Sequence, residues 1–457
     1  MKILTVLLSL FCATWALAEP RVPTSDLEIK LSFAPLVKQS APAVVNIYAK
    51  RIVEGRRNPF ESDPFFRDLF QGFSQSRPRV QNSLGSGVIL SSDGIVVSNN
   101  HVVDQASDIR VVLNDGQEFQ ADVLLADAES DLAVLKISTQ EELPFLTLRN
   151  SDTVEVGELV LAIGNPFGVG QTVSSGIVSG LARSGASVGN SQGYFIQTDA
   201  PINPGNSGGA LVGMNGQLIG VNTSILSRSG GSNGIGFAIP ATLVRQFVRQ
   251  AEEGRDTFVT PWMGAGGQSV TSDMAKALGL ERVTGVILTE LHPDSPLKAA
   301  GLTNGDVITA IDDAPVNSPA EALYRLKIAG LGQEVRVSYL SQGRAYDVTL
   351  NTSEAPTGPP AVTLSKSSLL PNLIVQDVSP KLIEGHQLPL GSEGVMVVDP
   401  TPTGARLGLR PRDILLEING RSVTNADDVE DYLRQTRRSG EFVVLRQGRQ
   451  ILLRFRT

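Results

Sequence analysis

Residues 199–210 read DAPINPGNSGGA and place Ser207 between glycines on a tight turn. Glycine adopts backbone conformations that other residues resist, and it lets a substrate carbonyl approach the chain closely. The N–H groups of Gly205, Asn206 and Ser207 can therefore converge on a developing oxyanion beside the Ser207 hydroxyl. The stretch predicts a nucleophile turn. Taken alone, it also fits an ordinary glycine-rich turn with an incidental serine.

Short apolar runs broken by Gly, Asn and Asp lie on both sides of this turn, from Gly85 to Pro240. They include residues 87–90, 109–113, 132–137, 159–163 and 218–221. Many short strands at regular spacing predict an all-β barrel or sandwich. After them, residues 241–253 change to helical spacing and end at Gly254, which is a helix stop.

A serine nucleophile needs a base, and the chain has 3 histidines, His101, His292 and His386. His101 follows an apolar run at the end of a predicted strand in the same β region, so it can reach a loop serine. The other two lie in predicted loops of the C-terminal part. An isolated histidine is by default structural, and this remains the alternative for His101.

A third residue must orient the imidazole and stabilise its cation. Asp131 begins the predicted strand over residues 131–135. On chemistry alone, Asp122, Asp127 and Asp199 compete with it for this role.

The C-terminal part contains an internal repeat. Residues 295–313 read SPLKAAGLTNGDVITAIDD, and residues 401–420 read TPTGARLGLRPRDILLEING, so that Asp306 aligns with Asp413. Predicted helices follow at 319–327 and 426–434. A repeat of this length indicates two copies of a whole domain, separated by the Pro-rich stretch at 353–360.

Length and composition agree with several globular domains. The 457 residues are 41% hydrophobic and 19% charged, which is typical of globular chains. The net charge is -8 and the basic residues are scattered, so we do not expect nucleic-acid binding.

The N-terminus resembles a secretory signal. Lys2 precedes an apolar run, and Ala-Leu-Ala at 16–18 fits a cleavage site, which predicts removal of residues 1–18. An uncleaved membrane anchor is the alternative. Cys12 lies in this segment and is the single cysteine, so the mature chain would have no thiol for a disulfide, a metal site or a nucleophile.

The order His101, Asp131, Ser207 is that of chymotrypsin-like enzymes. Residues 205–209, 99–103 and 131–136 resemble the serine, histidine and aspartate motifs of the HtrA (Deg/Do-like) family. Residues 163–168 and 234–240 are similar to two of its active-site loops. The resemblance extends over essentially the whole mature chain, with Asn100 as a departure where many relatives carry alanine.

This resemblance implies a mainly β fold with four parts after the signal peptide. They are a chymotrypsin-like double β-barrel protease domain at 19–258, PDZ domain 1 at 259–354, a linker at 355–366 and PDZ domain 2 at 367–457. The PDZ domains are expected in the circularly permuted form of bacterial proteases.

The resemblance also implies residue roles. Ser207 attacks the peptide carbonyl, His101 is the general base, and Asp131 holds the tautomer of His101. Gly205, Asn206 and Ser207 supply the oxyanion hole.

The same resemblance implies a specificity pocket and mobile loops. Ile225, Leu226 and Ile235 are candidate walls of an apolar pocket for small aliphatic side chains. Residues 164–170, 181–193 and 226–234 are expected to reorganise when substrate binds.

A PDZ domain captures a chain end by adding it as a strand and binding its carboxylate with loop amides. In the first copy, Met263, Gly264, Ala265 and Gly266 are in the position of that loop, with a plain hairpin turn as the alternative. In the second copy, residues 372–375 have no glycine. We do not expect that copy to bind carboxylates in the same way.

The resemblance implies an ATP-independent serine endopeptidase of the periplasm that degrades unfolded or misfolded exported proteins in stress response and quality control. No cofactor or metal is expected, since the chain has no HExxH motif or cysteine cluster. The resemblance also implies the partners. They are unfolded polypeptides, apolar C-terminal peptides and further copies of the chain, as a trimer or a multiple of it, with Phe65 and Phe66 as candidate contacts.

Two alternatives belong to other classes. The first is a holdase chaperone with minor or no proteolysis, and the second is a PDZ scaffold without enzymatic function. Neither requires the three motifs around His101, Asp131 and Ser207, although members of the family can combine protease and chaperone activity.

Overall fold

The computed structural model describes residues 32–53, 79–165, 170–181, 194–203, 205–225, 234–280, 282–436 and 439–456, with the backbone alone for 52–53, 79–83 and 224–225. The predicted signal peptide and the expected contacts Phe65 and Phe66 lie outside these residues. Among the described residues, none of the helices has the length and apolar character needed to cross a bilayer.

The first part of the chain closes into an antiparallel barrel after helix α2 (Ala34–Ser40). In spatial order its strands are β1 (Val44–Val53), β2 (Arg79–Ile89), β3 (Ile95–Ser98), β6 (Leu132–Ile137), β5 (Glu118–Asp127) and β4 (Asp108–Val112). β-branched and aliphatic residues of these strands fill the interior, where Ile47, Val96 and Leu135 are fully buried.

A second barrel follows directly. Its strands in spatial order are β7 (Leu159–Gly164), β8 (Thr172–Gly180), β9 (Ile196–Thr198), β12 (Gly236–Pro240), β11 (Leu218–Ile225) and β10 (Ala210–Gly213). Helix α5 (Ala241–Glu252) packs across both barrels, with Phe247 fully buried and stacked on Phe258 at 4.0 Å between ring centroids. One hydrophobic cluster is shared by the two barrels, which fixes them against each other.

The repeated half forms two further sheets, whose strand orders match except for one additional edge strand in the second sheet. The first contains β13 (Ala265–Ser269), β14 (Val286–Leu291), β15 (Val307–Ile311), β17 (Glu334–Ser341) and β18 (Arg344–Asn351), with β16 (Ala314–Pro315) beside β15. Its helices are α6 (Ser272–Ala277), α7 (Pro296–Ala299) and α8 (Pro319–Ala329).

The second sheet contains β19 (Val362–Thr363), β20 (Ile374–Asp377), β21 (Val395–Asp399), β22 (Ile414–Ile418), β24 (Ser439–Arg446) and β25 (Arg449–Arg456), with β23 (Arg421–Ser422) beside β22. Its helices are α9 (Pro380–His386), α10 (Thr401–Arg406) and α11 (Ala426–Gln435).

The aligned aspartates of the repeat have the same structural task. Asp306 Oδ2 accepts the N–H of Thr303 at 2.8 Å, and Asp413 Oδ2 accepts the N–H of Arg410 at 2.8 Å. Both carboxylates are buried, and they close equivalent turns before β15 and β22. The equivalence read from the sequence therefore extends to local hydrogen bonding.

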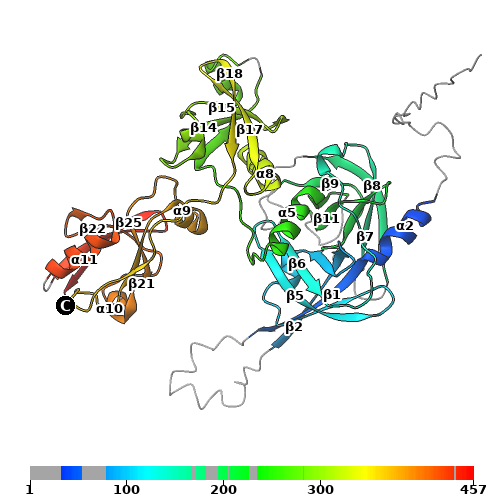
Figure 1. Ribbon diagram of the computed structural model, residues 1–457, viewed down its shortest axis with the longest axis horizontal. Helices are drawn as coiled ribbons and strands as arrows, with labels where there is room; N and C mark the ends of the chain where they lie inside the picture. Colours follow the sequence, from blue (N-terminus) through cyan, green and yellow to red (C-terminus); the bar gives the residue numbers. More distant parts are fainter. Residues whose placement is uncertain are drawn as a thin grey trace, which may run out of the picture.

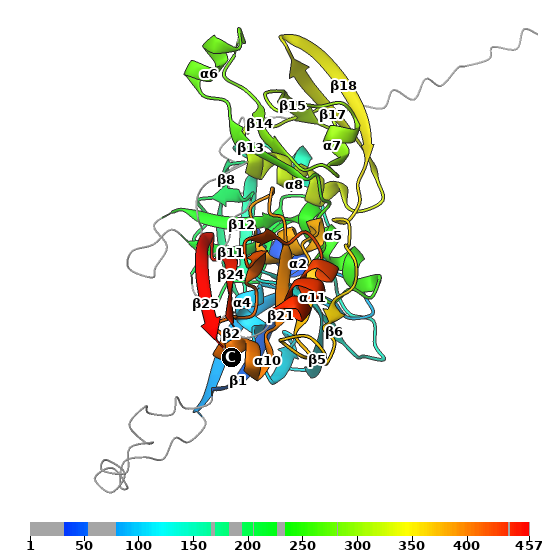
Figure 2. The ribbon, with the colours of Figure 1, turned by 90° about the vertical axis from the view of Figure 1, so that its left-hand side faces the viewer.

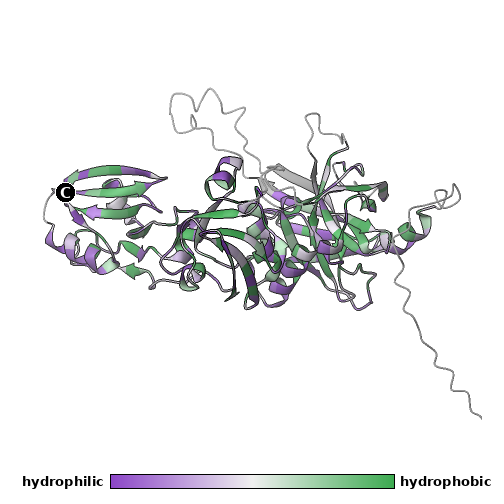
Figure 3. Ribbon diagram, turned by 90° about the horizontal axis from the view of Figure 1, so that it is seen from above, coloured by the Kyte–Doolittle hydropathy of each residue, from purple (hydrophilic) through white to green (hydrophobic). Residues whose placement is uncertain are grey.

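Figure 1 shows the two barrels on one side, the first C-terminal sheet above them, and the second C-terminal sheet at the far end, beyond α9. In the quarter-turned view of Figure 2, α8 lies between the first C-terminal sheet and the barrels, next to α5. Figure 3 shows hydrophobic residues concentrated in the strands. The expectation of a mainly β chain with two barrels followed by two further sheets is confirmed.

Candidate active site

His101 and Asp131 meet at the edge of the first barrel. His101 lies on the short helix α4 (Asn100–Val103), directly after β3, and Asp131 lies on the turn before β6. The His101 Nδ1 atom is 2.8 Å from Oδ2 and 2.9 Å from Oδ1 of Asp131, and the His101 backbone N–H also donates to Oδ1 at 3.0 Å. These contacts place the Nδ1 proton toward the carboxylate and leave Nε2 available as a base.

Two further residues hold Asp131 in place. Thr223 Oγ1 on β11 donates to Asp131 Oδ2 at 2.8 Å, and Asn99 Nδ2 donates to the Asp131 carbonyl at 2.9 Å. Asp131 has a positive φ of 54°, which aspartate tolerates better than most residues. The carboxylate is buried, whereas the His101 side chain is 51% exposed and open to a substrate.

Ser207 lies on a turn of the second barrel that is tied to the first barrel through Ser86 on β2. The Ser86 N–H donates to the Ser207 carbonyl at 2.9 Å, and Ser86 Oγ donates to the Gly205 carbonyl at 2.6 Å. Gly208 has φ 83°, and a Cβ there would lie 2.1 Å from the Ser86 carbonyl oxygen. Only glycine fits at this close crossing of the two barrels.

Thr223 connects the serine to the aspartate. Its carbonyl accepts the Ser207 hydroxyl at 2.8 Å, while its own hydroxyl donates to Asp131. Within the described residues, Ser207 and His101 share no hydrogen bond. The hydroxyl therefore has to rotate away from the Thr223 carbonyl to reach the imidazole.

The expected oxyanion donors differ in their surroundings. Asn206 N–H donates to the Asn203 carbonyl at 3.0 Å, so this amide is already used inside the turn. Its side chain is also held, since Thr172 Oγ1 donates to Asn206 Oδ1 at 2.7 Å. The structure records no hydrogen bond from the N–H of Gly205 or Ser207 to a described residue, so these two amides are the free candidates.

The competing aspartates have other partners. Asp127 Oδ2 accepts the Ser130 N–H at 2.7 Å, and Asp199 Oδ1 accepts the Ile177 N–H at 2.7 Å. Asp122 is exposed on β5. Asp131 is thus the carboxylate that the structure brings to His101.

The expected specificity residues are described only in part. Ile235 is partly buried and packs against the hydrophobic cluster between the barrels. Ile225 is described by its backbone at the end of β11, and Leu226 lies outside the described residues. The segments 166–169, 182–193 and 226–233 of the expected mobile loops also lie outside them.

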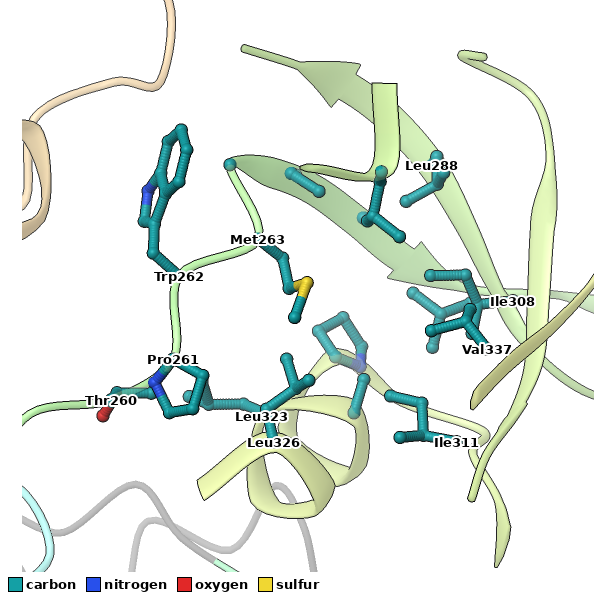
Figure 4. A pocket seen from close by; sticks show the side chains of 18 of the residues that line it. Thr260, Pro261, Trp262, Met263, Leu288, Ile308, Ile311, Leu323, Leu326 and Val337 are labelled. Atoms are coloured by element: carbon teal, nitrogen blue, oxygen red, sulfur yellow. The ribbon is translucent and has the colours of Figure 1, made fainter. Parts of the chain in front are cut away.

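An apolar groove runs between β13 and α8 in the first C-terminal sheet. Met263, Gly264, Ala265 and Gly266 line one side, and Leu323 and Leu326 line the other. Figure 4 shows the Met263 side chain extending into this groove toward Leu323 and Leu326, while Trp262 points to the other side of the chain.

The backbone of the groove loop is oriented by two hydrogen bonds. Ser295 Oγ donates to the Met263 carbonyl at 2.6 Å, and the His292 N–H donates to the Gly264 carbonyl at 2.8 Å. In a trans peptide the N–H points opposite to the C=O of the same unit. The N–H groups of Gly264 and Ala265 therefore point away from Ser295 and His292.

The corresponding edge of the second C-terminal sheet is covered by the chain itself. Strand β19 pairs antiparallel with β20, and Leu364 beyond it is buried in the core of this sheet. The Ser365 N–H donates to Glu430 of α11 at 3.0 Å. The expected linker therefore fills the space between β20 and α11, whereas β13 has a free edge among the described strands.

Helix α8 contacts the barrels with the face opposite to the groove. Tyr324 stacks on Tyr194 with ring centroids 3.9 Å apart, and Lys327 Nζ is 3.0 Å from Glu129 Oε1. Burial raises the pKa values of Tyr324 and Tyr194. Glu129 is two positions before Asp131 in the sequence, so α8 connects the groove to the segment that carries the carboxylate.

Within the described residues, no group of three or more His, Cys, Asp or Glu side chains is placed to hold a metal ion.

Comparison with protein families gives three matches along the chain. Residues 85–221 match the trypsin-like peptidase domain, and residues 261–352 and 394–446 each match a PDZ domain. The first match contains His101, Asp131 and Ser207, and the second contains the apolar groove.

Curated relatives are similar over most of the chain. The probable periplasmic serine protease do/HhoA-like of Haemophilus influenzae is 37% identical, covering 88% of this chain and 87% of the relative. The periplasmic pH-dependent serine endoprotease DegQ of Escherichia coli is 36% identical, covering 94% of this chain and 92% of the relative.

Solved structures are similar over about three quarters of the chain. The HtrA-type protease AlgW with a tripeptide has a TM-score of 0.55 and 38% identity, covering 72% of this chain and 99% of that one. The same protease with a decapeptide has a TM-score of 0.53 and 40% identity, covering 72% and 100%.

Proposed function

Since the chain belongs to the HtrA-type serine endopeptidases, with a trypsin-like peptidase domain and two PDZ domains, we propose that Ser207, His101 and Asp131 hydrolyse peptide bonds through an acyl-enzyme. The observation that carries this proposal is the position of Thr223, which hydrogen bonds to both Ser207 and Asp131. His101 contacts the same Asp131 carboxylate, so Thr223 links the Ser207 hydroxyl to the residue that orients the imidazole.

The reaction follows from these contacts. His101 Nε2 takes the Ser207 proton as Oγ forms a bond to the substrate carbonyl carbon, and the amides of Gly205 and Ser207 stabilise the oxyanion. The imidazolium then gives its proton to the leaving amine as the C–N bond breaks. In the second half of the reaction, His101 takes a proton from water as the water oxygen attacks the ester carbonyl carbon. The imidazolium then returns the proton to Ser207 Oγ as the C–O bond of the ester breaks. Asp131 stays ionised and favours the imidazolium.

We further propose that the substrates are unfolded or misfolded exported polypeptides and that cleavage needs no ATP. The relatives are named periplasmic proteases, and the first residues have the pattern of an export signal. We assign residues 1–18 to the signal, 19–258 to the protease domain, 259–354 and 367–457 to the PDZ domains, and 355–366 to the linker.

The groove of the first PDZ domain is proposed to bind apolar polypeptide C-termini. The apolar lining of the groove suits the side chain of an apolar last residue, and the N–H groups of Gly264 and Ala265 suit the terminal carboxylate. The second PDZ domain is not expected to bind in this way, because its own chain covers β20.

Two aspects of the proposal come from the family resemblance. The chain is proposed to assemble as a trimer or a multiple of it, with Phe65 and Phe66 as contacts. Chaperone activity toward the same clients is a second function. Light scattering and aggregation assays test these two points.

The test of the proposed reaction is degradation of casein by the full chain. The Ser207→Ala variant is expected to lose degradation while still binding casein, since the nucleophile alone is removed. Ser175→Ala is a matched control, because Ser175 is an exposed serine on β8 of the same barrel. Equal cleavage by the wild type and Ser207→Ala would remove the mechanism.

A further inference from the structure

The groove of the first PDZ domain contains a charged side chain from the second PDZ domain. Glu384 on α9 and Leu390 after it line the same groove as Met263 and Leu326. The segment that carries them rests on the first domain, since a Cβ at Gly391 would lie 2.9 Å from Glu290 Oε1 on β14. The groove is therefore walled by both PDZ domains.

Glu384 is the one charged residue among the described residues that line this groove. The others are apolar or are glycines, apart from Thr260. The Glu384 carboxylate is half-buried, and the structure records no hydrogen bond or ion pair from it to a described residue.

The charges around Glu384 are already matched with one another. Lys381 Nζ is 3.6 Å from Glu354 Oε2, and Lys327 Nζ is 3.0 Å from Glu129 Oε1. Desolvation raises the pKa of Glu384, and the carboxylates of Glu354 and Glu129 act in the same direction. Glu384 is thus an unmatched negative charge at the wall of an apolar groove.

We propose that Glu384 makes this groove selective for polypeptide C-termini that carry a Lys or Arg side chain upstream of an apolar last residue. This inference rests on the proposed binding of C-termini in the groove. An extended ligand along β13 points alternate side chains into the groove. A Lys or Arg side chain can place its apolar stem on the groove wall and its charged head at Glu384.

Binding of fluorescent peptides to the full chain tests this inference by anisotropy. The Ser207→Ala background prevents cleavage of the peptides. One series ends in the same apolar residue and carries Lys or Gln at each of the second to fifth positions from the C-terminus. Each peptide is also prepared as its C-terminal amide.

At one or more positions, the Lys peptide is expected to bind about fivefold more tightly than its Gln counterpart, since a partly desolvated ion pair is stronger than an exposed one. Glu384→Gln is expected to abolish this difference and to bind the Gln peptides as the unsubstituted protein does. Glu393→Gln removes an exposed charge from the same segment and is expected to keep the Lys preference.

The preference is also expected to disappear on acidification as Glu384 becomes protonated. The charged groups facing Glu384 are Lys381 on its own helix, Glu354 before the linker, Glu129 of the first barrel and Lys327 of α8. Hydrogen bonding to Arg255 holds the pKa of Glu354 below its usual value, so Glu354 stays ionised while Glu384 is neutralised. In Glu384→Gln the Lys and Gln peptides should bind equally at every pH.

A Lys peptide that binds no better than its Gln counterpart at any position, or a preference that survives in Glu384→Gln, would overturn the role of Glu384. If peptides with a free C-terminal carboxylate still bind more tightly than their C-terminal amides, the proposed capture of C-termini stands without a role for Glu384. Equal binding of acids and amides would overturn the groove proposal itself.

Discussion

At the scale of single residues, the candidate active site depends on how Asp131 is held. It accepts hydrogen bonds from His101 and Thr223 while its backbone has a left-handed conformation. Each of these contacts orients the imidazole before a substrate arrives, so the cost of ordering the side chains is met during folding rather than during the reaction.

The Asp131→Asn variant is expected to lower kcat by about 10³- to 10⁴-fold, because the amide favours the wrong His101 tautomer. Asparagine also tolerates the positive φ at this position, so the fold should be kept. Peptidase kinetics measures kcat, and a circular dichroism spectrum shows whether the fold is kept. Asp127→Asn is the matched control, and a similar loss there would argue that position 131 has no special role.

Thr223→Val is expected to lower kcat about tenfold with KM nearly unchanged, because it removes the hydrogen bond to the Asp131 carboxylate and keeps the side-chain shape. Steady-state kinetics gives the two constants. Thr198→Val removes another buried hydroxyl of the same barrel, which donates to the Ile177 carbonyl. It should reduce stability by about 1 kcal/mol without changing kcat. An unchanged kcat in Thr223→Val would contradict the role of Thr223.

The sequence predicted some of these residues and missed others for identifiable reasons. His101, Asp131 and Ser207 are each at the centre of a motif, whereas Asp131 could not be separated from Asp127 by chemistry alone. Thr223 and Ser86 act through a hydroxyl or a backbone group at the crossing of two barrels. Nothing in the local pattern distinguishes them from other strand residues, because their partners are distant in the sequence.

At the scale of elements, α8 has two apolar faces. Leu323 and Leu326 face the groove, while Tyr324 and Ile328 pack against the barrels. The helical spacing predicted the helix itself. It could not predict that the second face is covered by another domain, because an apolar residue in a helix does not identify what it packs against. Strand β19 was missed for a related reason, since a Pro-rich linker gives no strand pattern.

Two substitutions of Tyr324 are expected to affect the docking of α8 differently. Tyr324→Ala removes a buried ring and should cost about 3 kcal/mol. Tyr324→Phe removes a buried hydroxyl that has no hydrogen-bond partner among the described residues, and it should be neutral or stabilising. Hydrogen exchange of α5 and α8 measures the docking. If Tyr324→Phe loosened α8 as much as Tyr324→Ala, the hydroxyl would have to be the main contact.

At the scale of the whole molecule, the groove and the candidate active site are joined by one helix. The Lys327–Glu129 and Tyr324–Tyr194 contacts of α8 reach segments beside Asp131 and the second barrel. A ligand that shifts α8 would therefore change the contacts between α8 and the two barrels. The repeat predicted two copies of one domain, but the placement of these domains against the barrels depends on surfaces that have no sequence signature.

A peptide with a free apolar C-terminus is expected to stimulate casein cleavage severalfold, and its C-terminal amide is expected to stimulate weakly or not at all. The reason is that the carboxylate is the group that the Gly264 and Ala265 amides would bind. Initial rates at increasing peptide concentration measure the effect. Equal stimulation by acid and amide would show that the carboxylate is not what is recognised.

Covalent labelling of the intact protein by a fluorophosphonate tests the central claim most directly. We expect one adduct, located at Ser207 by peptide mass spectrometry, forming far more slowly in His101→Ala and absent in Ser207→Ala. A preparation that degrades casein but is labelled at another residue, or is not labelled at all, would contradict the account.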